Sequence, residues 1–415
     1  ITIESSAFRS MTTIRAPLGA GAITVDGTIT GENAASDLTL AGANPTTLNA
    51  NIVTAGADIT IQTPVILGAA LPGNLATLDT TNAGAVPAGA NVGITGTTSA
   101  ATDGVQGLSI ASGTGGVVSL GGTVGPGGAR VGSFAITSAA SANLPAINAA
   151  AGGISLTGGV FTLSNGVNTT AGGTFLVNNS GLLTLDTTAL SLDGAFTQNA
   201  GATGGVSLGT NITTTDDSIT FVRPLGLTNG VQLNTGAGGG DIVFGSTIDG
   251  AFPLDISAGT GAVNFGGRVG NPTAIGALTV FSAGSITVAG GTAPTINAAT
   301  VSLTTSGLLT INGTPADRGG ISSAGPLNIT AGSIIQSGNL GGSTVLISAS
   351  GAILVDADVS AGVGGVIVLH SGTSGTGDLN FGSSGPLLTA DDITLRAGDG
   401  AGGAGTTAIV DALTN

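Results

Sequence analysis

The sequence predicts an all-β fold, a parallel β-helix (β-solenoid) with coils of about 20 residues. Three observations lead to this fold class. Short runs of alternating apolar and polar residues recur along the chain, as at 241–244, 254–257 and 262–265. The 76 glycines of the chain are frequent between the runs, where corners need conformations that other residues avoid. One long segment also occurs in two copies. Alternation directs Val, Ile, Leu and Phe inward and Thr, Ser, Asn and Asp outward.

The first part of the chain already shows this organisation. Residues 1–30 open with the run ITIES and continue to AITVDGTIT, in which Asp26-Gly27 is a turn signal. Further runs follow at 37–40, 48–54, 58–62 and 65–67, with Gly, Asn, Asp or Pro between them. Residues 78–107 are richer in Ala, Gly and Thr and predict a more irregular part with more loops.

The internal repeat is the strongest signal. Residues 108–137, LSIASGTGGVVSLGGTVGPGGARVGSFAIT, align with 254–280, LDISAGTGAVNFGGRVGNPTAIGALTV. Leu108 matches Leu254, and the pair Gly121-Gly122 matches Gly266-Gly267. The small differences in length can be placed in turns, where insertions are tolerated. The Gly-Gly pairs and the Phe positions are therefore expected at corners and in core stacks.

The same kind of run fills residues 153–222 and 294–415. A single run is too short to enclose a core, so successive coils must stack strand on strand. The rival all-β fold, a string of antiparallel sandwiches, uses Trp or Tyr as core anchors, and the chain contains neither. We therefore expect one continuous solenoid over 1–415, with 1–30 as a terminal or subunit-contact segment.

Composition excludes several classes of function. The formal net charge is −15 and only 7% of residues are charged. An acidic chain lacks the cationic patch that nucleic acid or an anionic membrane requires. The chain has no cysteine and no apolar run of membrane-spanning length, which excludes disulfides, thiolate metal sites and a helical membrane span.

Three segments resemble a known family. They are NITTTDDSITFVRPLGLTNGVQLNTGAGGGDIVFGSTIDG (211–250), LDISAGTGAVNFGGRVG (254–270) and PLNITAGSIIQSGNL (326–340). These resemble the repeats of filamentous-haemagglutinin-type bacterial exoproteins. The resemblance implies a right-handed parallel β-helix that a bacterium exports to the cell surface or the extracellular space. It also implies a role as an adhesin, a filament or a matrix component.

Few residues stand out as chemical groups. His370, the only histidine, is expected to point outward from the run VIVLHSG (366–372), and no GxSxG nucleophile elbow accompanies it. The carboxylate pairs are Asp216-Asp217, Asp356/Asp358 and Asp391-Asp392. Such pairs can serve glycan hydrolysis or Ca²⁺ binding, but they more often cap turns. We therefore predict no catalytic, cofactor or metal-binding residue.

The sequence thus predicts a non-enzymatic, extracellular structural protein for adhesion or matrix. Solenoid ends expose strand edges, so we expect self-association through strands near Ile1–Ser5 and Thr407–Leu413, giving filaments. Cell-surface glycans or host receptors are further expected partners. The alternative is a β-helical protein that binds or cleaves glycans.

Overall fold

The fold class is confirmed. The computed structural model describes residues 1–17, 21–186, 188–291, 295–313, 319–398 and 407–408. The protein is an all-β solenoid of about 17 turns, with coils of about 23 residues rather than the expected 20. Coil length varies with the corner loops: Leu327 pairs with Val345, whereas Val65 pairs with Thr98 across the loop-rich part at 78–107. The described residues contain one helical element, the 3-10 turn η1 (Pro72–Asn74), and no helix suited to crossing a membrane.

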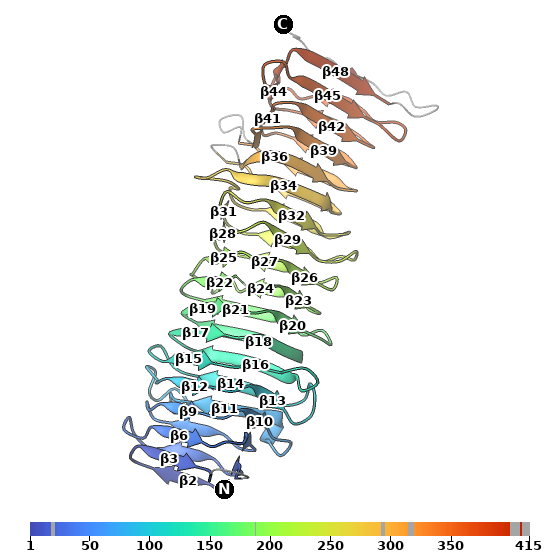
Figure 1. The fold of residues 1–415 in the computed structure, drawn as a ribbon. Coiled ribbons are helices and arrows are strands. Elements are labelled where there is room, and N and C mark those ends of the chain that lie inside the picture. The colour runs from blue at the N-terminus through green and yellow to red at the C-terminus, as the bar shows by residue number, and fades with distance from the viewer. Residues whose placement is uncertain (18–20, 187, 292–294, 314–318, 399–406, 409–415) are drawn as a thin grey trace. The chain divides into compact units, whose positions relative to one another are not determined.

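The chain divides into two compact units, Ile1–Thr210 and Asn211–Asn415, which are described separately. In each unit successive coils place parallel strands side by side (Figure 1). The continuity of one solenoid over 1–415 and the right-handed sense that the resemblance implies stay predictions.

Unit 1 contains three parallel sheets, and the chain visits them in turn. Sheet 1 consists of β1 (Thr2–Ile3), β4 (Ile23–Val25), β7 (Thr46–Leu48), β10 (Val65–Leu67), β13 (Thr98–Ala100), β20 (Val167–Thr169) and β23 (Leu190–Leu192), together with the first residues of β18. Sheet 2 consists of β2 (Ser6–Phe8), β5 (Ile29–Gly31), β8 (Ile52–Thr54), β11 (Leu75–Asp79), β14 (Gly107–Ala111), β16 (Val131–Ser138), β18 (Ile147–Gly158), β21 (Phe175–Asn179) and β24 (Phe196–Gln198). Sheet 3 consists of β3 (Thr12–Arg15), β6 (Leu38–Ala41), β9 (Ile59–Ile61), β12 (Val92–Ile94), β15 (Val117–Leu120), β17 (Ser141–Leu144), β19 (Val160–Leu163), β22 (Leu183–Leu185) and β25 (Val206–Leu208).

Unit 2 has the same plan. Sheet 4 consists of β26 (Ile212–Thr214), β29 (Val231–Asn234), β32 (Leu254–Ser257), β34 (Ile275–Ser282), β36 (Ile296–Thr304), β39 (Leu327–Ala331), β42 (Val345–Ala349), β45 (Val366–Ser371) and β48 (Asp392–Ala397). Sheet 5 consists of β27 (Ile219–Phe221), β30 (Ile242–Phe244), β33 (Ala262–Phe265), β35 (Ser285–Val288), β37 (Leu308–Ile311), β40 (Ser333–Gln336), β43 (Ile353–Val355), β46 (Leu379–Phe381) and β49 (Thr407–Ala408). Sheet 6 consists of β28 (Leu225–Leu227), β31 (Ile248–Asp249), β38 (Ile321–Ser323), β41 (Leu340–Gly342), β44 (Val359–Ala361) and β47 (Leu388–Thr389), together with the first residues of β36.

The core is a stack of like side chains at one strand spacing. Alternate residues of each strand are buried, as in Ile242–Phe244 and Leu183–Leu185. In unit 2 the ring of Phe244 stacks on Phe221 at 6.0 Å and on Phe265 at 5.4 Å between centroids. This confirms the expectation that Phe residues form stacks inside the solenoid.

Some polar residues face inward, contrary to the rule that Thr, Ser, Asn and Asp lie outside. Thr235 and Gln198 are buried at corners. The Thr235 hydroxyl donates to the carbonyl of Gly240 at 2.8 Å, and the Gln198 amide donates to that of Gly204 at 2.9 Å. A corner turns carbonyls into the interior, and an inward polar side chain satisfies them. Both residues keep the inward phase of their strands, since Gln198 follows Phe196 and Thr235 follows Leu233 at a spacing of two, so it is the polarity rule and not the alternation that fails here.

The two copies of the repeat share backbone details, one copy in each unit. Both have a β-bulge near the end of the long strand, which leaves Thr137 and Phe281 outside the regular pairing. In both, a glycine with positive φ follows a valine: Gly125 at 69° and Gly270 at 73°. Each of these glycines accepts a hydrogen bond from an Asn amide one coil later, Asn148 and Asn297 respectively. The Gly-Gly pairs lie at corners, as expected.

We predict that Gly125→Ala lowers the free energy of unfolding by about 3 kcal/mol, through left-handed backbone strain and a clash. A Cβ at Gly125 would lie 2.1 Å from the carbonyl oxygen of Asn148. The control is Gly93→Ala in the same unit, because a Cβ there meets nothing within 4 Å. Urea denaturation should separate the two variants, and equal stabilities would contradict this account of the corner.

We also predict that Phe244→Ala lowers the free energy of unfolding by about 4 kcal/mol, because it empties the centre of the ring stack. The control is Phe281→Ala, since Phe281 is 55% exposed and its loss should change stability by no more than about 0.5 kcal/mol. If both variants lose a comparable free energy of unfolding in thermal or urea denaturation, the ring stack does not contribute more to stability than an exposed Phe.

Candidate functional site at the edge of the first coil

The first coil contributes the edge strand of each of the three sheets of unit 1. Strands β1, β2 and β3 each pair with the next coil, through β4, β5 and β6. Among the described residues no strand pairs with them on the opposite side. The N–H of Thr12 donates to Asp37 at 2.8 Å and that of Ser6 to Thr28 at 3.1 Å. N–H directions alternate along a strand, so the N–H groups of Ala7 and Thr13 point away from the second coil.

Apolar side chains accompany this open edge. Ile14 is half-buried, whereas its ladder partner Leu40 is fully buried. Met11 is 73% exposed and Ile1 is 49% exposed. A row of outward-pointing backbone groups beside apolar side chains is the surface to which another β-strand can add.

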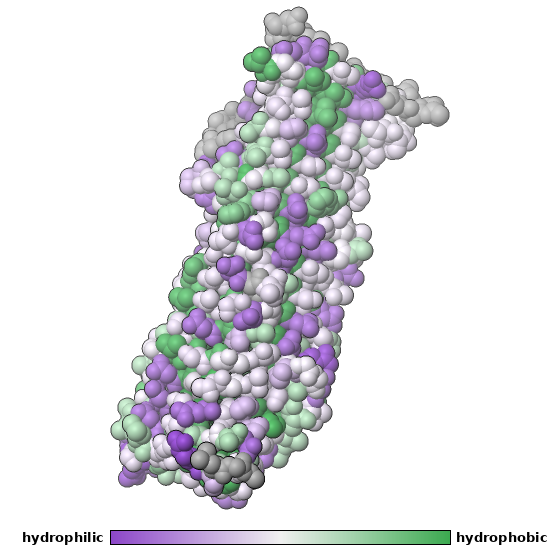
Figure 2. Space-filling view, viewed as in Figure 1, coloured by the Kyte–Doolittle hydropathy of each residue, from purple (hydrophilic) through white to green (hydrophobic). Residues whose placement is uncertain are grey.

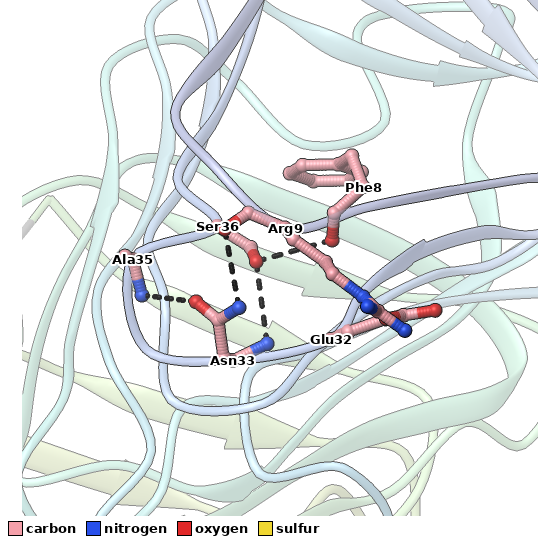
Figure 3. A network of polar contacts seen from close by, with 6 residues as sticks. All are labelled: Phe8, Arg9, Glu32, Asn33, Ala35 and Ser36. Atoms are coloured by element: carbon pink, nitrogen blue, oxygen red, sulfur yellow. Dashed lines mark hydrogen bonds and ion pairs between the residues drawn. The ribbon is translucent and has the colours of Figure 1, made fainter.

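A network of polar side chains fixes the corner of the first coil to that of the second (Figure 3). The Asn33 amide donates to the carbonyl of Arg9 at 3.1 Å, and the Ser36 hydroxyl donates to that of Phe8 at 3.2 Å. The Asn33 Oδ1 accepts from the N–H of Ala35 at 2.8 Å, which closes the turn. The network holds the corner after β2 in place although the first coil has a neighbour on one side alone.

An ion pair between Arg9 and Glu32 adds to this network. The hydrogen bond to Glu32, followed by its charge, raises the pKa of Arg9 above the ordinary value. The Arg9 side chain is 80% exposed, so water screens the pair and its effect on stability is small. The hydrogen bonds to main-chain carbonyls therefore matter more for the shape of the edge.

The carboxylate pairs that the sequence singled out lie at corners, except Asp392, which is the first residue of β48 and pairs with Val366. Asp216 accepts from the N–H of Gly238 at 2.6 Å, and Asp391 accepts from that of Gly364 at 3.0 Å. Asp358 accepts from the N–H of Leu387 at 2.9 Å, and Asp356 is bonded to Ser384. Each bond joins neighbouring coils, which agrees with the expectation of turn caps. The described residues contain no group of three or more His, Cys, Asp or Glu that could hold a metal ion.

Other acidic residues use the same coil-to-coil bond, which explains how an acidic chain with 7 basic residues remains compact. Their carboxylates accept from main-chain N–H groups of an adjacent coil: Asp37, Asp58, Asp103, Asp193, Asp241 and Asp249. Backbone donors thus take the place of cationic side chains.

His370 lies on β45, half-buried, on the outer side of sheet 4. Its ladder partners are Ser348 and Arg396. It borders a shallow groove that Leu346 and Val368 also line. The outward placement expected from the run VIVLHSG is therefore confirmed.

The expected contact strands are partly described. Within Ile1–Ser5 the strand β1 covers Thr2–Ile3, and the open edge continues through β2 and β3, which the sequence did not identify as edge strands. Within Thr407–Leu413, β49 pairs in parallel with β46, and residues 409–413 lie outside the described residues.

Comparisons with protein-family models, with curated proteins and with solved structures found no match for the chain. The resemblance to filamentous-haemagglutinin-type exoproteins therefore stays a prediction.

We predict that Arg130→Gln raises the pKa of Asp103. In the wild type the side-chain hydrogen bond from Arg130, followed by its backbone hydrogen bond, lowers that pKa. A depressed pKa in the folded state means that the pair stabilises the fold above the ordinary pKa of Asp, and that this contribution is lost as the pH falls through the lowered value. Carbon-13 NMR titration of the Asp103 carboxyl measures the change, and identical midpoints in both proteins would contradict it.

Proposed function

We propose that this chain is a non-enzymatic structural protein of the bacterial cell exterior. In this proposal it is a secreted β-solenoid that serves adhesion or an extracellular matrix, and its copies join end to end into filaments. The observation that carries the proposal is the stacking of parallel strands from coil to coil, an arrangement that strands of a second copy would extend at β1, β2 and β3. The cell exterior and the bacterial source rest on the resemblance of 211–250, 254–270 and 326–340 to exoprotein repeats.

The edge supports strand addition because it is large and ordered. Three strand edges lie in one coil, and the Asn33 and Ser36 contacts hold its corner. In such a contact the first coil of one copy binds a different surface of the next copy, so each copy keeps its own first coil free for another contact. Such a head-to-tail contact propagates into a filament when it does not close into a ring.

The outer surface fits an extended assembly. The face seen in Figure 2 mixes neutral, polar and apolar residues over each unit. Only 7% of residues are charged, so few charged groups repel one another where neighbouring copies meet. Thr, Ser and Asn provide the hydration that charges supply on most proteins.

The proposal predicts that purified chains associate more as their concentration rises, and that proline at the edge weakens this association. Ala7→Pro combined with Thr13→Pro removes two N–H groups that point away from the second coil. The loss of two strand-edge hydrogen bonds should weaken association by about tenfold or more. Sedimentation velocity measures the association, and negative-stain microscopy shows whether the assemblies are linear.

The matched control is Ala7→Val with Thr13→Val, which keeps both N–H groups and should associate as the wild type does. Circular dichroism tests that the proline variant keeps its β-structure, as edge strands tolerate proline where the N–H faces outward. A wild type that sediments as a monomer at every concentration would overturn the filament. Assembly that is insensitive to the prolines would overturn the role of the first coil.

The alternative hypothesis, a β-helical protein that binds or cleaves glycans, has one observation in its favour. Unit 1 carries an uncharged groove lined by Gly, Ala, Ser, Thr and Asn, which suits a carbohydrate.

A further inference from the structure

A groove of about 590 Å³ runs along the corner between sheets 2 and 3 of unit 1. Residues from five successive coils line it, from the turn before β15 to the turn before β25. Its polar side chains include Thr114, Thr137, Thr157, Asn178, Ser180 and Thr203. The rest of the lining is Gly, Ala and Ser, so the groove contains no charged and no aromatic residue.

Glycine makes the floor of this groove. A Cβ at Gly159 would lie 2.1 Å from the carbonyl oxygen of Ala140, and one at Gly113 would lie 2.4 Å from that of Ala88. Gly113 also has a φ of 75°, which side chains rarely adopt. The coils approach so closely that no side chain fits at these positions. The main chain is therefore bare along the bottom, and the hydroxyl groups stand beside it.

The hydroxyl groups are held in defined orientations. Ser180 donates to the carbonyl of Gly158 at 3.2 Å, and Thr203 donates to that of Ser180 at 3.3 Å. Thr137, the bulge residue, donates to Ile110 at 3.3 Å. A hydroxyl that donates its hydrogen to a backbone carbonyl keeps both lone pairs of its oxygen as acceptors.

Donors lie between these acceptors. The Thr157 hydroxyl and the Asn178 amide are ladder neighbours on β18 and β21. Among the described residues, neither side chain makes a hydrogen bond within the protein, so both retain donors for a ligand. Uncharged donors and acceptors in one groove suit the hydroxyl groups of a neutral carbohydrate.

Two exposed apolar side chains follow the groove-lining turns along the chain. Val160, the first residue of β19, comes directly after the lining residue Gly159 and is 41% exposed, and Leu182, just before β22, is 47% exposed. A Cβ at Gly181 would lie 2.8 Å from a methyl group of Val160, so this valine lies over the bare backbone of Gly181. A sugar ring has a hydroxyl rim and apolar C–H faces; the groove offers polar partners for the rim, and Val160 next to it offers an apolar partner for a face.

The spacing of the groups matches a chain of sugars. Neighbouring strands are about 4.8 Å apart, close to the length of one sugar unit in an extended polysaccharide. Successive coils can therefore meet successive sugars with similar contacts. The net charge of −15 disfavours acidic polysaccharides. We propose that this groove binds a neutral, extended polysaccharide strand that runs across the coils of unit 1. This inference deepens the proposed function and rests on its adhesive role.

Calorimetric titration of the full chain with cellohexaose, laminarihexaose and chitohexaose tests the groove, with oligogalacturonate as the acidic comparison. At least one neutral oligosaccharide should bind, and the acidic one should not. Nitrogen-15 correlation spectra should shift at Gly113, Gly159 and Gly201. Absence of binding by all the neutral oligosaccharides, or shifts elsewhere in the chain, would overturn the proposal.

The variant Thr157→Val with Asn178→Leu removes the two side chains that retain donors and should weaken binding by about tenfold. The control Thr184→Val changes an outward threonine of β22 that does not line the groove, and it should bind as the wild type does. Equal losses in the variant and the control would also overturn the proposal. Measuring binding on the Ala7→Pro, Thr13→Pro chain separates this test from the one for assembly, since the groove lies in other coils.

Discussion

The parallel backbone hydrogen bonds between successive coils are the interaction on which the rest of the structure depends. A run such as Ile242–Phe244 has two inward side chains and cannot exclude water by itself. When coils stack, each inward residue meets its counterpart one strand spacing away, and Phe221, Phe244 and Phe265 form one apolar column. Stability therefore comes from neighbouring coils, and any coil with one neighbour has different properties from the others.

Stacking leaves backbone carbonyl and N–H groups at the corners without strand partners, and residues at the corners provide those partners. Each corner turns carbonyl and N–H groups out of the sheets, and each needs a partner. Glycines such as Gly125 allow the turn, carboxylates such as that of Asp216 accept N–H groups from an adjacent coil, and buried residues such as Gln198 bond the inward carbonyls. The same devices explain an acidic composition with few basic residues, because the acceptors are matched by backbone donors rather than by cations.

Both functional proposals follow from the stacking geometry. In the first proposal, strands of a second copy add to outward main-chain donors of the first coil, such as the N–H of Thr13. The groove forms where close corners at Gly113 and Gly159 leave the main chain bare between rows of hydroxyl groups. Neither surface requires a cluster of catalytic groups. The groove repeats similar contacts from coil to coil, whereas the edge lies in the first coil alone.

The sequence by itself determined the fold class, the internal repeat, the Phe stacks and the outward position of His370. Alternation and glycine spacing act locally, so they can be read from short runs. It did not determine the coil length, the inward polar residues or the groove. Thr235 continues the inward phase of Val231 and Leu233, and Thr157 stands in the outward phase after Leu156, although both are polar. What each side chain contacts, a corner carbonyl for Thr235 and the groove for Thr157, depends on the residues that the neighbouring coils place beside it, and the register between distant segments decides that.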